Sequence, residues 1–217
     1  MKRISFLVIA ATALFLSCSS SNGETEKARN DSTPGSTNAA PAAPVPTNHN
    51  ARLQPIMDST MIRMGRVELT NNPTKDFAML MRMHHVGGRH LIQEALKNNT
   101  DSGISKLART IDASLAKESV DLNRFIIDKR YQQKQKESKA SNELMKAMTP
   151  ANETASPTAN SNEEEFPRVM ITYLQTANDM VKVMEDNGAD YDISGFAEEM
   201  VARNKGYIEQ LKQLATK

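Results

Sequence analysis

The sequence predicts an all-α protein, in which two tandem helical hairpins form an up-down four-helix bundle and a short helix precedes them. The first observation is an internal repeat. Residues 77–111 align without a gap on residues 166–200, at a constant offset of 89 positions and with their apolar residues in register. The second is that no segment alternates apolar and polar residues with a period of two, which argues against half-buried strands. The third is that Gly and Pro cluster between the periodic blocks, where short turns join antiparallel helices. A duplicated two-helix unit accounts for all three observations.

The first 17 residues have the composition of an export signal. Lys2 and Arg3 precede an apolar run, residues 4–16, that is too short to span a bilayer permanently. Residues 14–18 resemble the lipobox of bacterial lipoproteins, whose cysteine is lipidated and becomes the mature N-terminus. We therefore expect Cys18 to anchor the protein to a membrane of the bacterial cell envelope, on the periplasmic side or at the cell surface. Since it is the sole cysteine, no intrachain disulfide can form.

Composition also suggests where the globular part begins. Residues 18–51 consist largely of Ser, Asn, Thr, Pro and Ala, too few of them apolar to form a core, so a disordered tether is expected. A second polar stretch, residues 149–164, separates repeat one (74–140) from repeat two (165–215), and the helical bundle should span residues 52–217. Without Lys2 and Arg3 the chain has 25 basic and 26 acidic residues, a net charge of −1 that gives no reason to expect nucleic-acid binding.

The helices of the first repeat follow from periodicity and capping residues. A short helix is expected from Leu53 to about Val67, followed by an amphipathic helix over residues 76–97. The next helix begins after a polar turn, with Asp101 or Ser102 as its cap, and it can continue through the charged stretch 128–139.

The second repeat predicts the same plan. Its first helix places apolar residues from Phe166 to Met184 on one face, and its second places apolar residues from Ile193 to Leu211 inward. Gly188 in the turn between them suits the left-handed residue that ends many helices.

Two positions on the predicted inner faces are polar where a simple core would be apolar. His84 lies centrally on its helix face with His85 at the edge, and Glu118 lies centrally on the next helix. Because His84 and Glu118 are nearly equidistant from the turn, they should lie at the same height in the hairpin. The second repeat has Tyr173 and Tyr207 at the matching positions, so a polar layer is expected at the centre of the bundle.

Two interpretations of this layer follow from the residue types. In the first, the histidine and glutamate hydrogen-bond to one another and fix the register of the helices. In the second, facing helices supply a metal site, with His84 and His85 as primary ligands, Met81 as an added soft ligand and Glu118 as a ligand or an orienting group. Imidazole and thioether donors together favour copper. A di-iron site is not expected, because the chain lacks the required Glu-x-x-His on two helices.

Methionine and histidine also recur on outward-facing positions. If the short first helix covers the outer face of the following one, a secondary Met/His cluster would form from six residues: Met57, Met61, Met64, Met79, Met83 and His90. Methionine at helical spacing is more often flexible core filler than a ligand. No phosphate-binding glycine loop, dinucleotide fingerprint or catalytic constellation occurs, so the sequence gives no support for an enzyme.

The segment Asp76-Phe77-Ala78-Met79-Leu80-Met81-Arg82-Met83-His84-His85 resembles the signature of the family named domain of unknown function 305. Leu107-Ala108 and the later Glu118 match the continuation of that family's hairpin. The resemblance covers residues 53–126 well and the second repeat only in its apolar pattern. It implies a ferritin-like bundle, exported and often lipid-anchored in bacteria, with some members linked to copper. The chain departs from the family at Val86-Gly87-Gly88 and in having no histidine pair in its second repeat.

These observations lead to one expected function and one alternative. The expectation is an exported lipoprotein that binds a transition metal, copper first, in or on its helical bundle for buffering, storage or delivery. The alternative is a non-catalytic envelope interaction or stress-related module, in which the His/Glu pair is structural and the partner is another envelope protein or a second copy of the chain.

Overall fold

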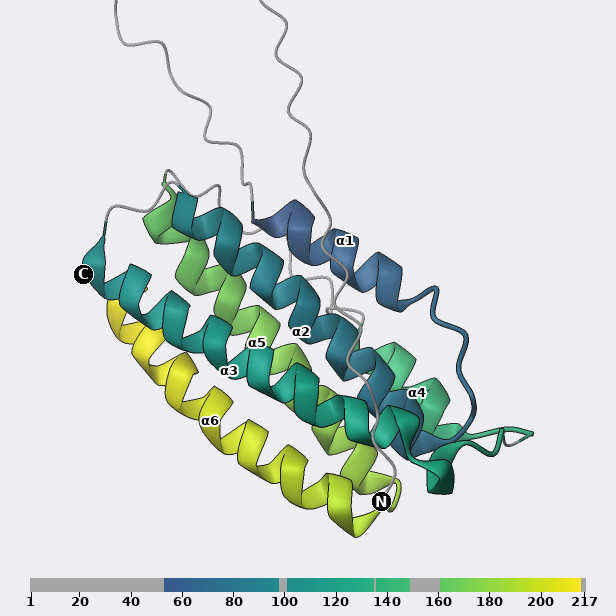
Figure 1. The fold of residues 1–217 in the computed structure, drawn as a ribbon. Helices are drawn as coiled ribbons and strands as arrows, with labels where there is room; N and C mark the ends of the chain where they lie inside the picture. Colours follow the sequence, from purple (N-terminus) through teal and green to yellow (C-terminus); the bar gives the residue numbers. More distant parts are fainter. Residues whose placement is uncertain (1–52, 98–100, 135, 149–160, 216–217) are drawn as a thin grey trace, which may run out of the picture. The chain divides into compact units, whose positions relative to one another are not determined.

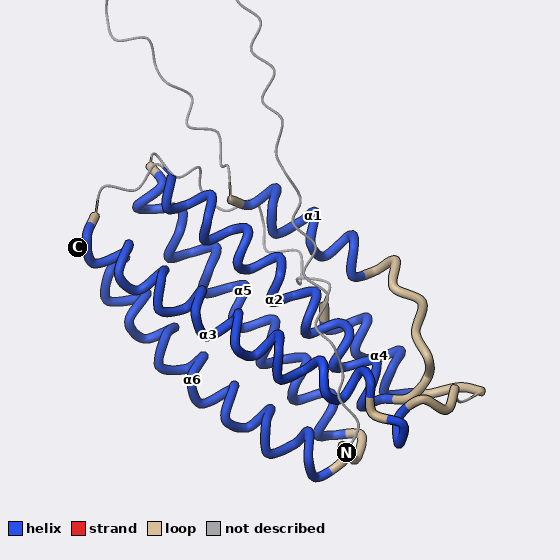
Figure 2. The backbone as a smooth tube through the Cα atoms, viewed as in Figure 1, coloured by secondary structure: helices blue, strands red, loops and turns tan. Residues whose placement is uncertain are grey.

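A computed structural model describes residues 53–97, 101–134, 136–148 and 161–215, and in this part of the chain the regular structure is entirely helical (Figure 2). The predicted signal, the tether and most of the polar linker lie outside the described residues. The helices are α1 (Gln54–Met64), α2 (Pro73–Lys97), α3 (Ser102–Ile127), the 3-10 turn η1 (Lys129–Tyr131), α4 (Lys139–Ala147), α5 (Asn162–Asp186) and α6 (Tyr191–Ala215). The predicted all-α class is confirmed.

The four long helices form the bundle (Figure 1). α2 packs on α3 and α5 packs on α6, and the two hairpins meet along the α2–α5 and α3–α6 contacts. Each long helix contributes an apolar stripe to one shared core. The largest fully buried side chains include Phe77, Leu80, Met81, Leu91 and Ile92 of α2, Ile111 and Leu122 of α3, and Phe166 and Tyr173 of α5.

Local signals fix the ends of several helices. The side chain of Asp101 accepts a hydrogen bond from the main-chain N–H of Ile104 at 2.7 Å, which confirms it as the cap of α3. Gly188, in the turn between α5 and α6, has a φ of 76°, a left-handed conformation that glycine adopts without steric cost. α3 does not continue through residues 128–139. Asp128, the residue that follows the end of α3, is extended, and its side chain accepts a hydrogen bond from Arg130 N to begin η1.

α4, which the sequence did not predict as a separate helix, packs against α5 and α2. Its Ser141 hydroxyl donates a hydrogen bond to the fully buried Asp76 at 2.7 Å, and the other carboxylate oxygen of Asp76 accepts from the main-chain N–H and the hydroxyl of Thr70. Asp76 therefore joins α2, the preceding loop and α4. Because a buried carboxylate is costly without partners, this set of hydrogen bonds is what makes its position tolerable.

α1 lies against α2 and α5. Its N-terminus has no side-chain cap of its own, but Oε1 of Glu165 in α5 accepts hydrogen bonds from the main-chain N–H groups of Leu53 and Gln54 at 3.0 and 3.3 Å. Farther along, α1 passes close to Gly87 of α2, where an added Cβ would lie 2.2 Å from Cγ2 of Thr60. The missing side chain of Gly87 is what allows α1 to approach α2 this closely.

Candidate functional site

His84 lies near the middle of α2 and is completely enclosed by the bundle, with no exposed surface. Its ring stacks on that of Tyr173 of α5, with ring centroids 3.9 Å apart and planes inclined by 29°. The Tyr173 hydroxyl donates a hydrogen bond to the main-chain carbonyl oxygen of His84. Tyr173 is the residue that matches His84 in the second repeat, so the two equivalent positions are in direct contact.

Glu118 of α3 contacts the neighbouring histidine, His85. Nε2 of His85 lies 2.8 Å from Oε2 of Glu118, and both side chains are buried. The distance suits a hydrogen bond, but the ring N–H is not well aligned with the carboxylate, so the two groups form a close polar contact in the interior of the bundle. The sequence predicted His84 as the partner. Adjacent residues on a helix differ by about 100° in direction, and equal height in the hairpin does not distinguish between them.

The second oxygen of Glu118 is also occupied. Oε1 accepts a hydrogen bond from Nε of Arg203 in α6 at 2.9 Å and another from the hydroxyl of Ser114 at 3.0 Å. Arg203, about one third exposed, lies between this carboxylate and solvent, whereas the tyrosine predicted to face Glu118, Tyr207, is only half-buried. Sequence reasoning missed Arg203 because a long charged side chain near the edge of an apolar face is usually solvated. Its signal was its position one helical turn before Tyr207.

Burial controls the electrostatics of the site. It lowers the pKa of His84 well below 6.5, and repulsion from the neighbouring His85 lowers it further. Burial alone would raise the pKa of Glu118, but the combined contacts with His85 and Arg203 outweigh it and hold that pKa below 4.5. His84 is therefore neutral at neutral pH, and Glu118 is a carboxylate.

Several ring nitrogens of the two histidines have no hydrogen-bond partner among the described residues. Both ring nitrogens of His84 and Nδ1 of His85 are buried and make no hydrogen bond to any described residue. Met81 is fully buried one turn earlier on α2, at the spacing that brings side chains together on one face. Within the described part of the chain, no three His, Cys, Asp or Glu side chains gather closely enough to hold a metal ion, so His84, His85 and Glu118 do not form such a group together.

The predicted secondary Met/His cluster divides between two environments. Met57, Met61 and Met64 of α1 are buried in the core, whereas His90 is exposed. The two remaining methionines of α2, Met79 and Met83, are half-buried. The thioethers of α1 and the imidazole of His90 thus differ in burial, and the secondary cluster stays a prediction.

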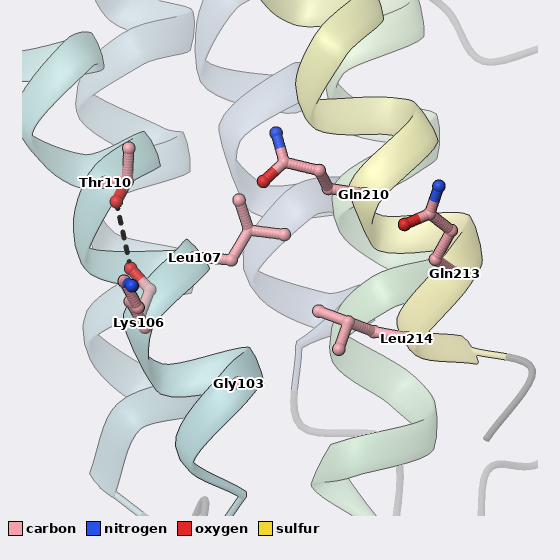
Figure 3. A pocket seen from close by; sticks show the side chains of 7 residues that line it. All are labelled: Gly103, Lys106, Leu107, Thr110, Gln210, Gln213 and Leu214. Atoms are coloured by element: carbon pink, nitrogen blue, oxygen red, sulfur yellow. Dashed lines mark hydrogen bonds between the residues drawn. The ribbon is translucent and has the colours of Figure 1, made fainter.

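A cavity of about 300 Å³ lies between the start of α3 and the end of α6, and neither His84 nor His85 lines it (Figure 3). Leu107 and Leu214 line it from the two helices, and amide and hydroxyl groups surround them. The hydroxyl of Thr110 donates a hydrogen bond to the main-chain carbonyl of Lys106. The full lining is Gly103, Lys106, Leu107, Thr110, Gln210, Gln213 and Leu214, with no His, Cys, Asp or Glu among them.

A model of the family described as domain of unknown function (DUF305) matches residues 74–215. The match begins at the start of α2 and ends with α6, so it takes in both hairpins and the histidine pair. No curated protein and no solved structure matches the chain. None of the helices in the described ranges is long and apolar enough to cross a membrane.

Proposed function

The chain belongs to the family of the domain of unknown function DUF305, and we propose that it binds a transition metal, copper first, through its buried histidine pair for buffering, storage or delivery. The observation that carries the proposal is the state of His84: both of its ring nitrogens are fully buried with no hydrogen-bond partner among the described residues. Leaving buried polar atoms unpaired costs free energy, and a bound metal ion is one way in which that cost is recovered.

The protonation state of His84 and the donor type of Met81 fit this proposal. A metal ion binds the neutral imidazole, and burial lowers the pKa of His84 so that the neutral form prevails at neutral pH. Met81 supplies a thioether one turn away, a soft donor that favours Cu(I). The ligand set that we propose is therefore His84, His85 and Met81.

Glu118 is better suited to orienting His85 than to binding metal itself. Its oxygens already contact His85, Arg203 and Ser114. A carboxylate held in this way against one ring nitrogen fixes the orientation of the imidazole and raises the basicity of the other nitrogen. Of the two roles that the sequence allowed for Glu118, the orienting one is supported by these contacts.

Location is the second part of the proposal. We propose that residues 1–17 are a cleaved signal and that lipid on Cys18 attaches the protein to the bacterial envelope, facing the periplasm or the cell surface. All of these residues lie outside the described part of the chain, so the support is the sequence pattern itself.

A specific observation favours the alternative function, an envelope interaction module without metal. Three described side chains contact the carboxylate of Glu118, and no third His, Cys, Asp or Glu in the described residues completes a metal group with the two histidines. A polar layer that only fixes helix register would have these properties.

Anaerobic titration with Cu(I) against a competing chelator separates the two functions. The full-length protein should bind one Cu(I) tightly, and the double variant His84→Ala, His85→Ala should lose that binding. His90→Ala, which changes the exposed histidine of the same helix, is the matched control and should bind as the parent does. Met81→Leu keeps the volume of the buried side chain and should weaken Cu(I) binding without unfolding the bundle, as circular dichroism would verify.

Glu118→Gln tests the orienting role. Loss of such a partner typically weakens metal affinity about 10- to 100-fold. Equal affinity in the parent and in the double histidine variant would exclude the metal function and leave the interaction module.

A further inference from the structure

A second cavity, of about 210 Å³, lies between α1 and α2, and its chemistry differs from that of the histidine pair. Thr60 and Arg63 line it from α1. Arg82, Met83, Val86 and Gly87 line it from α2. No acidic side chain and no histidine is among its lining residues, so the metal proposal does not use it.

The cavity has two guanidinium groups that lack an acidic partner. Arg63 and Arg82 are exposed, and neither pairs with a carboxylate in the described part of the chain. Arg63 donates one hydrogen bond to the hydroxyl of Thr60 at 3.3 Å, and its other four N–H groups have no acceptor among the described residues. This arrangement contrasts with Arg89, Arg130 and Arg203, each of which pairs with a carboxylate.

The same place is also unusually apolar for a surface. Val86 is 58% exposed and Met83 is half-buried, and both line the cavity. Ile62, which precedes Arg63 on α1, is 56% exposed. A ligand that fits this surface needs an anionic group to pair with the cations. It also needs a short apolar body to contact the exposed apolar side chains.

Thr60 and Gly87 fix the floor of the cavity. The Thr60 hydroxyl donates to the main-chain carbonyl of Ile56 at 2.9 Å, and an added Cβ at Gly87 would lie 2.6 Å from the Tyr173 hydroxyl. The floor is thus rigid and leaves no room for deeper penetration. A ligand must lie across the mouth, where its apolar part meets Met83 and Val86 and its charge meets the arginines.

We propose that this cavity binds a small organic carboxylate with a short alkyl or similarly apolar body. The planar guanidinium group binds a carboxylate through two parallel hydrogen bonds, which gives arginine its advantage over lysine at such sites. The volume is smaller than that of typical sites for drug-sized ligands, about 300–1,000 Å³, so the body must be short.

The test is NMR of the full-length protein labelled with ¹³C at its methionine methyl groups, titrated at constant ionic strength. The probe is hexanoate, with hexan-1-ol as the uncharged analogue and inorganic phosphate as the anion without an apolar body. The Met83 methyl signal should shift saturably with hexanoate, while the signal of the buried Met200 in α6 stays in place.

Variants divide the site into its charged and apolar parts. The double variant Arg63→Gln, Arg82→Gln should raise the dissociation constant of hexanoate by about tenfold or more, because it removes both charge-assisted hydrogen-bond donors. Val86→Ser should weaken hexanoate as well. Arg109→Gln, which changes an exposed arginine on α3 away from the cavity, is the matched control and should change nothing.

Each departure from these results overturns the proposal in a recognisable way. No saturable shift at Met83 would mean that the cavity does not bind carboxylates. Equal binding of hexan-1-ol would mean that the arginines contribute nothing. Equal binding of phosphate would mean a general anion site without use of Val86 and Met83.

Discussion

Gly87→Ala tests how closely α1 approaches α2 at the residue that lies just after the two histidines on α2. The new Cβ would lie 2.2 and 2.4 Å from Cγ2 and Oγ1 of Thr60, and 2.6 Å from the Tyr173 hydroxyl. These distances are far below van der Waals contact. Thr60 cannot rotate away cheaply, because its hydroxyl is bonded to the main-chain carbonyl of Ile56 and its branched Cβ restricts its rotamers. Tyr173 is held by its stack on His84. The substitution must therefore displace α1.

The magnitude follows from two opposing effects. Overpacking of a tight core costs about 1–3 kcal/mol, and three contacts this short put Gly87→Ala at the upper end of that range. Alanine is favoured over glycine inside a helix by about 1 kcal/mol. The free energy of unfolding should therefore fall by about 2 kcal/mol.

Gly206→Ala in α6 is the matched control, because nothing lies within 4 Å of the Cβ that it adds. This variant keeps only the gain in helix propensity and should stabilise the protein by about 1 kcal/mol or slightly less. Urea unfolding followed by circular dichroism measures both values. If Gly87→Ala proves as stable as Gly206→Ala, α1 does not approach α2 as closely as described, and the rigid floor inferred for the adjacent cavity is refuted.

Two further predictions concern the pH dependence and the attachment of α1. Because the pKa of His84 is well below 6.5 in the folded state, the unfolded chain binds more protons, and the free energy of unfolding should decrease as the pH falls below about 6.5. Urea titrations between pH 8 and 5.5 would measure this slope, which His84→Gln should flatten; a slope unchanged in the variant would contradict the assignment. Glu165→Ala removes the hydrogen bonds to Leu53 N and Gln54 N and should cost about 1 kcal/mol, with faster proteolysis within α1. Cleavage at the parent rate would show that this cap does not hold α1.

The sequence predicted the features that depend on local pattern. The repeat and its apolar stripes predicted the two hairpins. The residue types in the turns predicted the cap at Asp101 and the left-handed conformation of Gly188. These features depend on interactions within a few residues, which composition and spacing record directly. The burial of His84 and Glu118 also followed from helical periodicity.

The features that the sequence did not predict depend on contacts between distant elements. The rotation of α2 about its own axis decides which histidine contacts Glu118. The two candidates are adjacent residues, so their spacing in the sequence does not distinguish them. Arg203 reaches Glu118 from α6, 85 positions away. α4 is short and is joined to α2 through Ser141 and Asp76, 65 positions apart. No local pattern specifies such pairs.

The stack of His84 on Tyr173 joins two residues one repeat length apart, so two equivalent positions of the repeats pack against each other. At most positions of a duplicated fold, each copy can change without affecting its counterpart. Where a residue packs against its own equivalent, a substitution in one copy alters the environment of the other. Tyrosine opposite histidine keeps two flat rings in contact at this level of the bundle. The asymmetry between the repeats is therefore a property of the pair, and these two positions should show strong energetic coupling in a double-mutant cycle.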